Sequence, residues 1–183
     1  MIRDTKGFDM ANAADRPKRV LITGGTRGIG KSIAREFARA GFDVAFTGRT
    51  RAAGEGREED EHGKATPLAG SPDATQKEVE ALGREALPIQ LDLLDPASVD
   101  AGAAIVDETW GTIDVLVNNA MYEMGRYTNA WIKDTPMEEF AAKIQANFLA
   151  PLALAKYFLP GMIEAGGGRI INLSTRHNYT KQG

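Results

Sequence analysis

Short apolar runs alternate along the chain with longer segments in which apolar residues recur at helical spacing. After the first run, for example, Ile29, Ile33 and Phe37 recur in this way until Gly41. The apolar runs occupy residues 19–23, 44–47, 88–91, 113–118 and 169–174. The expected helices occupy residues 29–40, 75–86 and 98–110, and a long fourth helix begins at residue 136 and ends near residues 161–168. Buried strands that each return through a helix predict an α/β fold, with about five parallel strands covered on both faces.

The last of these helices has a distinct start and an irregular middle. Thr135 supplies a hydroxyl N-cap, Pro136 occupies the first helical position, and Glu138 follows three residues after the cap. Further along, Pro151 has no N–H to donate to the carbonyl of Asn147, which predicts a kink. The carbonyl freed in this way would face a partner or water. In the alternative interpretation, Asn147 only satisfies the helix distortion.

Composition narrows the classes of function. The 183 residues carry 22 Lys plus Arg against 25 Asp plus Glu, a net charge of −3, which argues against a nucleic-acid partner. There is no cysteine and the two histidines stand apart, so we expect neither thiol chemistry nor a metal site. The longest apolar run, residues 148–155, is shorter than the roughly 18 to 20 residues that span a bilayer. We therefore expect a cytoplasmic protein with no membrane partner.

Two segments depart from the strand and helix pattern. Residues 1–18 mix acidic and basic side chains without an apolar block, so they are interpreted as a flexible extension before a single domain at 19–183. Residues 50–74 are charged, contain several Gly and Pro residues, and show no apolar periodicity. We expect a solvated insertion here, with a flap over a cofactor or substrate as the alternative.

A glycine-rich turn, TGGTRGIG at residues 23–30, joins the first strand to the first helix. In such a turn the backbone N–H groups and the positive end of the helix point at an anion, and glycines let a phosphate approach closely. A glycine pattern alone is weak evidence. Its place in the first strand-turn-helix unit of a parallel sheet favours a pyrophosphate site.

Five motifs follow one another along the chain. They are Thr-Gly-x-x-x-Gly-x-Gly at residues 23–30, Asp92-Leu93, Asn118-Asn119-Ala120, Asn147 in the long helix, and Asn172-Leu173-Ser174-Thr175 at the end of the fifth strand. Together they resemble the short-chain dehydrogenase/reductase family. The resemblance covers residues 18–175. It implies a doubly wound Rossmann-type sheet, a nicotinamide dinucleotide cofactor, hydride transfer between a small alcohol and its carbonyl compound, and a homo-oligomer for a full-length chain.

The resemblance also implies roles for individual residues. The glycine turn would hold the pyrophosphate, Asp92 and Leu93 would lie at the adenine, and Asn119 and Ala120 would line the adenosine side. The turn residues implied are Gly24, Thr26, Arg27, Gly28, Ile29 and Gly30. From the residues alone, Asp92 and Asn119 are polar groups at the carboxyl ends of buried strands, where open α/β sheets bind ligands. For Asp92, a helix N-cap or a turn carboxylate is the alternative.

The end of the second strand favours NADP(H) over NAD(H). Proteins that bind NAD place an acidic residue there, whereas this chain has Arg49, and Arg27 supplies a second cation from the glycine turn. Two guanidinium groups suit the extra phosphate of NADP, because each can bind it through two hydrogen bonds. The alternative is that Arg49 pairs with the acidic insertion.

The resemblance implies acid/base chemistry by a tyrosine and a lysine four residues later, beyond a hydroxyl at the end of the fifth strand. By register Thr175 takes the hydroxyl role, with Ser174 as the alternative, and Asn147 would help to hold a water in the proton relay. The Tyr-x-x-x-Lys pair is expected further on, and the chain stops at Gly183.

We therefore expect the amino-terminal part of an NADP-dependent oxidoreductase, either truncated or a fragment, that lacks its own acid/base pair. A dinucleotide-binding module without turnover is one alternative. A methyltransferase-like protein is another, disfavoured because such proteins usually have an acid where Gly48 and Arg49 stand. The fifth strand is expected to form an exposed apolar edge through which the chain self-associates.

Overall fold

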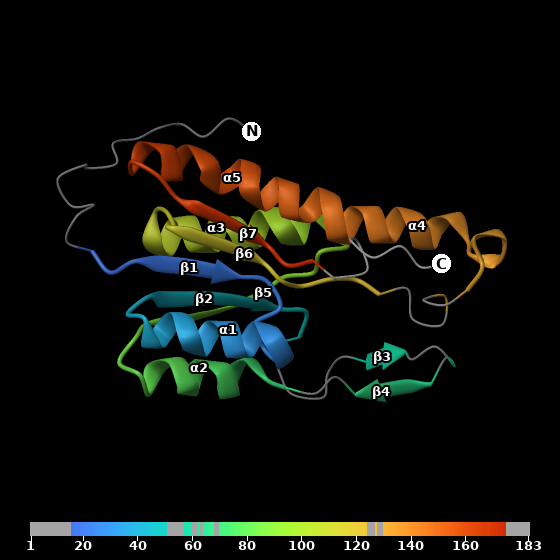
Figure 1. Ribbon diagram of the computed structural model, residues 1–183, viewed down its shortest axis with the longest axis horizontal. Helices are drawn as coiled ribbons and strands as arrows, with labels where there is room; N and C mark the ends of the chain where they lie inside the picture. The colour runs from blue at the N-terminus through green and yellow to red at the C-terminus, as the bar shows by residue number, and fades with distance from the viewer. Residues whose placement is uncertain are drawn as a thin grey trace.

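The computed structural model describes residues 16–50, 57–59, 62, 64–67, 70–123, 127 and 130–174. Within them, one sheet of five parallel strands has the order β5-β2-β1-β6-β7 (Figure 1). The strands are β1 Arg19–Ile22, β2 Asp43–Gly48, β5 Ala86–Gln90, β6 Val115–Asn118 and β7 Arg169–Asn172. The α/β fold and the Rossmann-type parallel sheet expected from the sequence are confirmed.

Helices cover the two faces of the sheet. The helices are α1 Gly28–Arg39, α2 Pro72–Glu80, α3 Pro96–Trp110, α4 Met137–Ile144 and α5 Ala150–Glu164, with a short 3-10 helix at Ile132–Asp134. On one face α1 and α2 pack over the sheet, and on the other face α3 and α5 do so (Figure 1).

Alternate residues of each central strand face opposite cores, because successive side chains of a strand point to opposite faces. In β1, Val20 and Ile22 join the core beneath α1 and α2, which also contains Phe46. Between them, Leu21 joins the core beneath α3 and α5, which also contains Phe158. All of these side chains are at most 1% exposed. This two-sided burial explains why the strands read as continuous apolar runs.

The direction of the strand order changes at β1. The chain passes outward from β1 to β2 and β5, then returns to place β6 on the other side of β1. Ile22 of β1 pairs with Val117 of β6. The segment after β1 leads to α1 on one face of the sheet, and the segment after the neighbouring β6 leads to α5 on the other face. Open parallel sheets form their ligand crevice at such a switch point.

Three boundaries expected from the sequence are wrong. Thr135 does not cap α4, because its hydroxyl donates to the carbonyl of Trp131 at 3.1 Å, and the helix begins at Met137 without a side-chain cap. Helix α2 starts three residues earlier than expected, where Ser71 accepts a hydrogen bond from the N–H of Ala74 at 3.2 Å. It also ends earlier, at Glu80, before Gly83 in a left-handed conformation with φ +71°.

Near Asn147, where Pro151 predicts a kink, the structure has a π-helical turn, Gln145–Leu149, between α4 and α5. The N–H of Ala150 donates to the carbonyl of Gln145, five residues back. Pro151 lies at the first turn of α5, where a missing N–H is tolerated. The chain thus accommodates the proline by widening one turn.

The combined helix Met137–Glu164 is long and apolar enough to cross a bilayer by length and composition alone. Core helices of soluble proteins meet the same criterion, and 33% of its most apolar window is buried in this structure. This is weak evidence for a membrane span, so the expectation of no membrane partner stays a prediction.

The charged insertion contains secondary structure that the sequence did not indicate. Two short antiparallel strands, β3 Arg57–Glu59 and β4 Ala65–Pro67, form a hairpin apart from the main sheet. The hairpin projects on the side of the carboxyl ends of the sheet (Figure 1). Residues 51–56, 60–61, 63 and 68–69 of the insertion lie outside the described residues.

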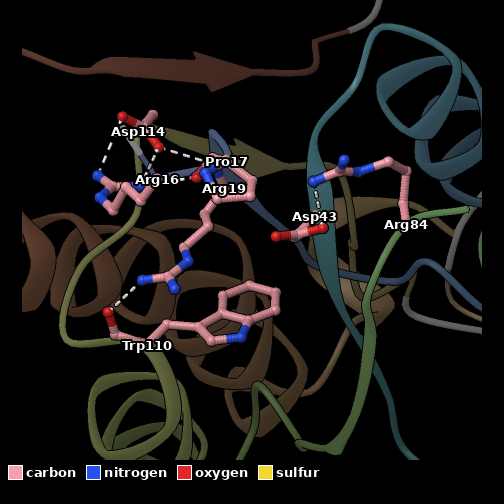
Figure 2. A network of polar contacts seen from close by, with 7 residues as sticks. All are labelled: Arg16, Pro17, Arg19, Asp43, Arg84, Trp110 and Asp114. Carbon is pink, nitrogen blue, oxygen red and sulfur yellow. Dashed lines mark hydrogen bonds and ion pairs between the residues drawn. The ribbon is translucent and has the colours of Figure 1, made fainter. Parts of the chain in front are cut away.

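The predicted N-terminal extension enters the described part of the chain at Arg16, and residues 1–15 lie outside it. Two guanidinium nitrogens of Arg16 donate to the carboxylate of Asp114 at 2.8 and 3.2 Å. The same carboxylate accepts from the backbone N–H of Arg19 at 2.7 Å. Asp114, which directly precedes β6, therefore binds both Arg16 and the amino end of β1 (Figure 2).

A polar network continues along this amino edge of the sheet. The Arg19 guanidinium lies 5.5 Å from the ring centre of Trp110 and donates to its carbonyl (Figure 2). Burial, with the neighbouring Arg16 as a smaller cause, lowers the pKa of Arg19 from its usual value. Nearby, Arg84 donates to the buried carboxylate of Asp43 at 2.6 Å. These groups fix the edge opposite the glycine turn.

Candidate functional site

Thr23 and Asn119 join the carboxyl ends of β1 and β6. The Thr23 hydroxyl accepts from the backbone N–H groups of Asn119 and Ala120, each at 3.0 Å. In return, the Asn119 side-chain amide donates to the carbonyls of Thr23 at 2.8 Å and Gly24 at 3.2 Å. The glycine turn and the segment after β6, which the sequence analysis assigned to one cofactor, are thus brought together at the switch point.

The glycines of the turn serve different purposes. A Cβ on Gly24 would lie 2.9 Å from Cβ of Ala120, and one on Gly30 would lie 2.1 Å from the carbonyl oxygen of Gly24. These two glycines permit close packing against the neighbouring segments. Gly24 also has a positive φ, +69°. Gly28 has φ +53°, but nothing lies within 4 Å of where its Cβ would be. It permits the left-handed conformation that begins α1 and leaves the space beside the helix end open.

The start of α1 is suited to an anion. Arg27 occupies the N-cap position in an extended conformation without a side-chain cap, and the first turn contains no acidic residue. Uncapped N–H groups and the positive end of the helix dipole favour a negative ligand. Ile29 of this turn is 68% exposed and lines an open groove with Gly28 and Ser32. The Ile29 side chain therefore lies on the outer surface of α1.

Two further buried threonines support the turn, and the sequence analysis did not identify them. The Thr47 hydroxyl, at the end of β2, accepts from the N–H of Gly24 at 3.2 Å. The Thr75 hydroxyl, in α2, donates to the carbonyl of Gly25 at 3.0 Å. Both threonines are at most 2% exposed. A threonine at the end of a buried strand could have indicated the role of Thr47, whereas nothing local indicates the role of Thr75.

One of the two arginines proposed to bind a phosphate lies in the glycine turn, and the other directly follows β2. Arg27 is half-buried at the start of α1, and Arg49 is exposed directly after β2. The carbonyl of Arg49 accepts from the Gln90 side chain at 3.2 Å, which ties the end of β2 to β5. Thr26 packs between these segments, where a Cβ on Gly48 would lie 2.6 Å from its Cγ2.

Asp92 and Leu93 follow β5 at the same edge of the sheet. One carboxylate oxygen of Asp92 accepts from the N–H of Leu94 at 3.0 Å, which makes it a turn carboxylate. Asp95, not Asp92, caps α3, by accepting from the N–H of Ala97 at 2.9 Å. The Leu93 side chain is 8% exposed and belongs to the core. Their contacts with adenine stay predictions.

Asn147 holds the loop that follows β6. Its side-chain oxygen accepts from the N–H of Tyr122 at 2.7 Å, and its side-chain nitrogen donates to the carbonyl of Tyr122 at 2.9 Å. The Tyr122 hydroxyl in turn donates to Glu139 at 2.8 Å. The π-turn therefore presents Asn147 to the segment beyond Ala120. Its part in a proton relay stays a prediction.

The hydroxyl expected at the end of β7 is only partly described. Ser174 is exposed two residues beyond β7, and Thr175 lies outside the described residues. Asn118 donates to the side chain of Asn172 at 2.8 Å, which aligns the ends of β6 and β7. Across the described part of the chain, no three His, Asp or Glu side chains gather as metal ligands would.

Comparison with known proteins identifies the family. The sequence pattern of the short chain dehydrogenase family matches residues 18–70 and 65–181. The chain belongs to this family. Dehydrogenase/reductase SDR family member 7B from Mus musculus is 31% identical over 156 residues, which are 85% of this chain and 43% of the relative. NADP-dependent 3-hydroxy acid dehydrogenase YdfG from Salmonella typhi is also 31% identical, over 85% of this chain and 53% of the relative.

Solved structures of short-chain dehydrogenases share the fold. A metagenomic short-chain oxidoreductase in complex with NADP has a TM-score of 0.70 and 31% identity, over 86% of this chain and 62% of that structure. Acetoin dehydrogenase YohF from Salmonella typhimurium has a TM-score of 0.71 and 28% identity, over 91% and 58% respectively. The chain spans about half the length of the curated relatives from Mus musculus and Salmonella typhi.

Proposed function

We propose that this chain provides the NADP(H)-binding part of a short-chain oxidoreductase, which transfers a hydride between the nicotinamide and a small alcohol or its carbonyl compound. The single observation that carries the proposal is the junction of Thr23 and Asn119. The uncapped start of α1 lies beside Asn119, at the point where the strand order reverses between β1 and β6. This is the location at which open parallel sheets bind dinucleotides.

The residues present fit a dinucleotide. The N–H groups at the start of α1 would hold the pyrophosphate, and the open space at Gly28 leaves room for its oxygens. Asn119 and Ala120 would line the adenosine side, and Asp92 would meet the adenine. The bound nicotinamide would supply the hydride. The chain's own contribution is to bind and orient the cofactor at the edge of the sheet.

Two arginines support NADP(H) over NAD(H). Arg27 and Arg49 lie at the start of α1 and just beyond the end of β2, on the two segments that flank Thr26. NAD-binding proteins place an acidic residue at the end of the second strand, and none stands there in this chain. The name of the Salmonella typhi relative and the NADP complex of the metagenomic structure are consistent with this choice.

Fluorescence titration with NADPH and NADH tests the proposal. Replacing Arg27 or Arg49 by Ala should raise the Kd of NADPH about tenfold or more, the effect of losing a charge-assisted hydrogen bond, and should leave that of NADH nearly unchanged. Arg39→Ala is the matched control, because Arg39 is an exposed arginine of the same helix, paired with Glu36. Tighter binding of NADH would contradict the cofactor choice, and binding of neither would refute the proposed function.

The acid/base pair of the reaction needs its own test. No tyrosine in the 183 residues has a lysine four positions later. We therefore expect the 183-residue chain to bind NADPH without oxidising it when ketones are added. Ser174 or Thr175 would hydrogen-bond the substrate oxygen once the pair is supplied by further sequence. Steady NADPH oxidation by this chain alone would contradict the expectation.

A dinucleotide-binding module without turnover is the second candidate, favoured by the same missing pair. A coding sequence that continues through Tyr-x-x-x-Lys would decide against it. The proposed cellular location is the cytoplasm, testable by fractionation. The proposed assembly for a longer chain that includes the pair is a homo-oligomer, testable by light scattering.

A further inference from the structure

The glycine turn has a support that comes from the charged insertion. We infer that residues 70–75, the entry to α2, position the turn, and that Gly70 sets the place of Arg27 and thereby the preference for a phosphorylated dinucleotide. This inference rests on the proposed function. The family pattern matches the chain in two pieces, residues 18–70 and 65–181, which overlap just where this entry begins. Residues 70–75 therefore follow the stretch at which the match to the family pattern divides into two pieces.

Gly70 lies against the backbone of the turn. It has φ +96°, and a Cβ added to it would lie 2.6 Å from the carbonyl oxygen of Thr26 and 2.9 Å from Cβ of Arg27. A Cβ on Gly48 would lie 2.6 Å from Cγ2 of Thr26. Thr26 is thus packed closely by Gly48 at its side chain and by Gly70 at its carbonyl. A Cβ at position 70 would therefore require a shift of the Gly70 backbone or of the peptide that carries Arg27, and either shift changes the contact between them.

Thr75 fixes the preceding peptide. Its hydroxyl is 1% exposed and donates to the carbonyl of Gly25 at 3.0 Å. The N–H of Gly25 donates to the carbonyl of Thr47 at 2.9 Å, so both polar groups of this residue are bound. The Ser71 cap fixes the first turn of α2, from which Thr75 projects. The orientation of the turn therefore depends on where the insertion re-enters the fold.

The two residues should have different effects on binding. Gly70 contacts the peptide of Arg27, whose cation would meet only the extra phosphate of NADP. Thr75 contacts the part of the turn that would hold the pyrophosphate, which NAD and NADP share. A change at position 70 should alter the ratio of the NADPH and NADH affinities. A change at position 75 should alter both of these affinities by a similar factor. Both are positioning residues, because they act through the turn.

The test is the Kd of NADPH and of NADH for the 183-residue chain and its variants, with a thermal melt of each variant. Gly70→Ala should raise the Kd of NADPH about tenfold, the cost of one misplaced charge-assisted contact, and should change that of NADH less than about twofold. Thr75→Val, which keeps the side-chain shape and loses the hydroxyl, should raise both values by a similar factor of about five.

Gly83→Ala is the matched control. Gly83 also has a positive φ, +71°, but nothing lies within 4 Å of where its Cβ would be. It carries the same backbone strain without the contact, so its ratio of Kd values should equal that of the unchanged chain. If Gly70→Ala leaves the ratio of the NADPH and NADH Kd values unchanged, the role of Gly70 is overturned. If Thr75→Val leaves both Kd values unchanged, the role of Thr75 is overturned.

A double variant separates positioning from general damage. If Gly70 acts through Arg27, combining Gly70→Ala with Arg27→Ala should lower NADPH affinity no further than Arg27→Ala does alone. Independent, additive losses would overturn the inference. The proposed function fails separately, if the unchanged chain binds neither dinucleotide. If Gly70→Ala does not fold, the Thr75→Val result alone decides whether the entry to α2 positions the turn.

Discussion

Thr23 and Asn119 bind each other through both their side chains and their backbones. The Thr23 hydroxyl accepts from the Asn119 N–H at 3.0 Å, and the Asn119 side chain donates to the Thr23 carbonyl at 2.8 Å. Because these residues directly follow β1 and β6, their bonds set how the glycine turn and the segment after β6 lie together at the switch point. The site and the stability of the fold therefore depend on the same contacts.

Thr23→Val should destabilise the chain. The valine keeps the shape of the side chain but leaves the N–H groups of Asn119 and Ala120 without their acceptor, a cost of about 2 to 4 kcal/mol. Urea denaturation measures the free energy of unfolding. Thr109→Val is the control, because Thr109 is an exposed helical threonine that donates to the carbonyl of Ile105. Equal effects of the two variants would show that Thr23 has no special role.

Asn147→Ala should release the loop after β6. The variant removes both hydrogen bonds to the backbone of Tyr122, with an expected loss of about 1 to 3 kcal/mol. The Tyr122 amide should then exchange its hydrogen at least about tenfold faster. Gln145→Ala removes a neighbouring bond, to the carbonyl of Leu93, and should leave exchange at Tyr122 unchanged. Unaltered exchange in Asn147→Ala would refute the anchoring role.

Asp114→Asn should weaken the amino edge of the sheet. Asp114 binds Arg16 and the N–H of Arg19, and its loss of charge should cost about 2 kcal/mol of unfolding free energy. Asp134→Asn breaks the exposed pair with Lys133 and should cost less than about 0.5 kcal/mol. Chemical denaturation of the two variants should show this difference. A loss in Asp114→Asn no larger than in the control would contradict the structure of the edge.

The edge strand β7 should promote self-association of the chain. Ile170 and Ile171 of this strand are 39% and 43% exposed, and an exposed apolar edge pairs readily with another strand. Ile171→Lys should reduce the association measured by light scattering. Ile163→Lys, on the exposed face of α5, is the control. A stronger effect of the control, or a monomeric unchanged chain, would contradict association through the edge.

The sheet and its crevice could be predicted because the controlling signals are local. Residues 19–30 contain the whole strand, turn and helix start, and the apolar runs record burial on both faces. Thr75 could not be predicted, because its hydroxyl meets Gly25 only after the chain returns from the insertion. The cap expected at Thr135 is wrong for a similar reason. The Thr135 hydroxyl donates to the carbonyl of Trp131, which directly precedes the 3-10 helix Ile132–Asp134, although the local sequence matches a capping pattern.

The chemistry at Asn147 shows the same limit. The missing N–H of Pro151 predicts an irregular helix, but sequence alone does not say whether the helix kinks or widens. The structure widens it into a π-turn, and the Asn147 side chain then reaches Tyr122. The partner comes from a loop 25 positions away, which no local pattern specifies.

An NMR titration of the isotopically labelled chain with NADPH, followed through the backbone amide signals, locates the dinucleotide site directly. The largest shifts should fall on the N–H groups of the glycine turn, residues 24–30, and of Asn119 and Ala120. Shifts centred on another part of the chain, or none at saturating NADPH, would contradict a dinucleotide site at the junction of β1 and β6.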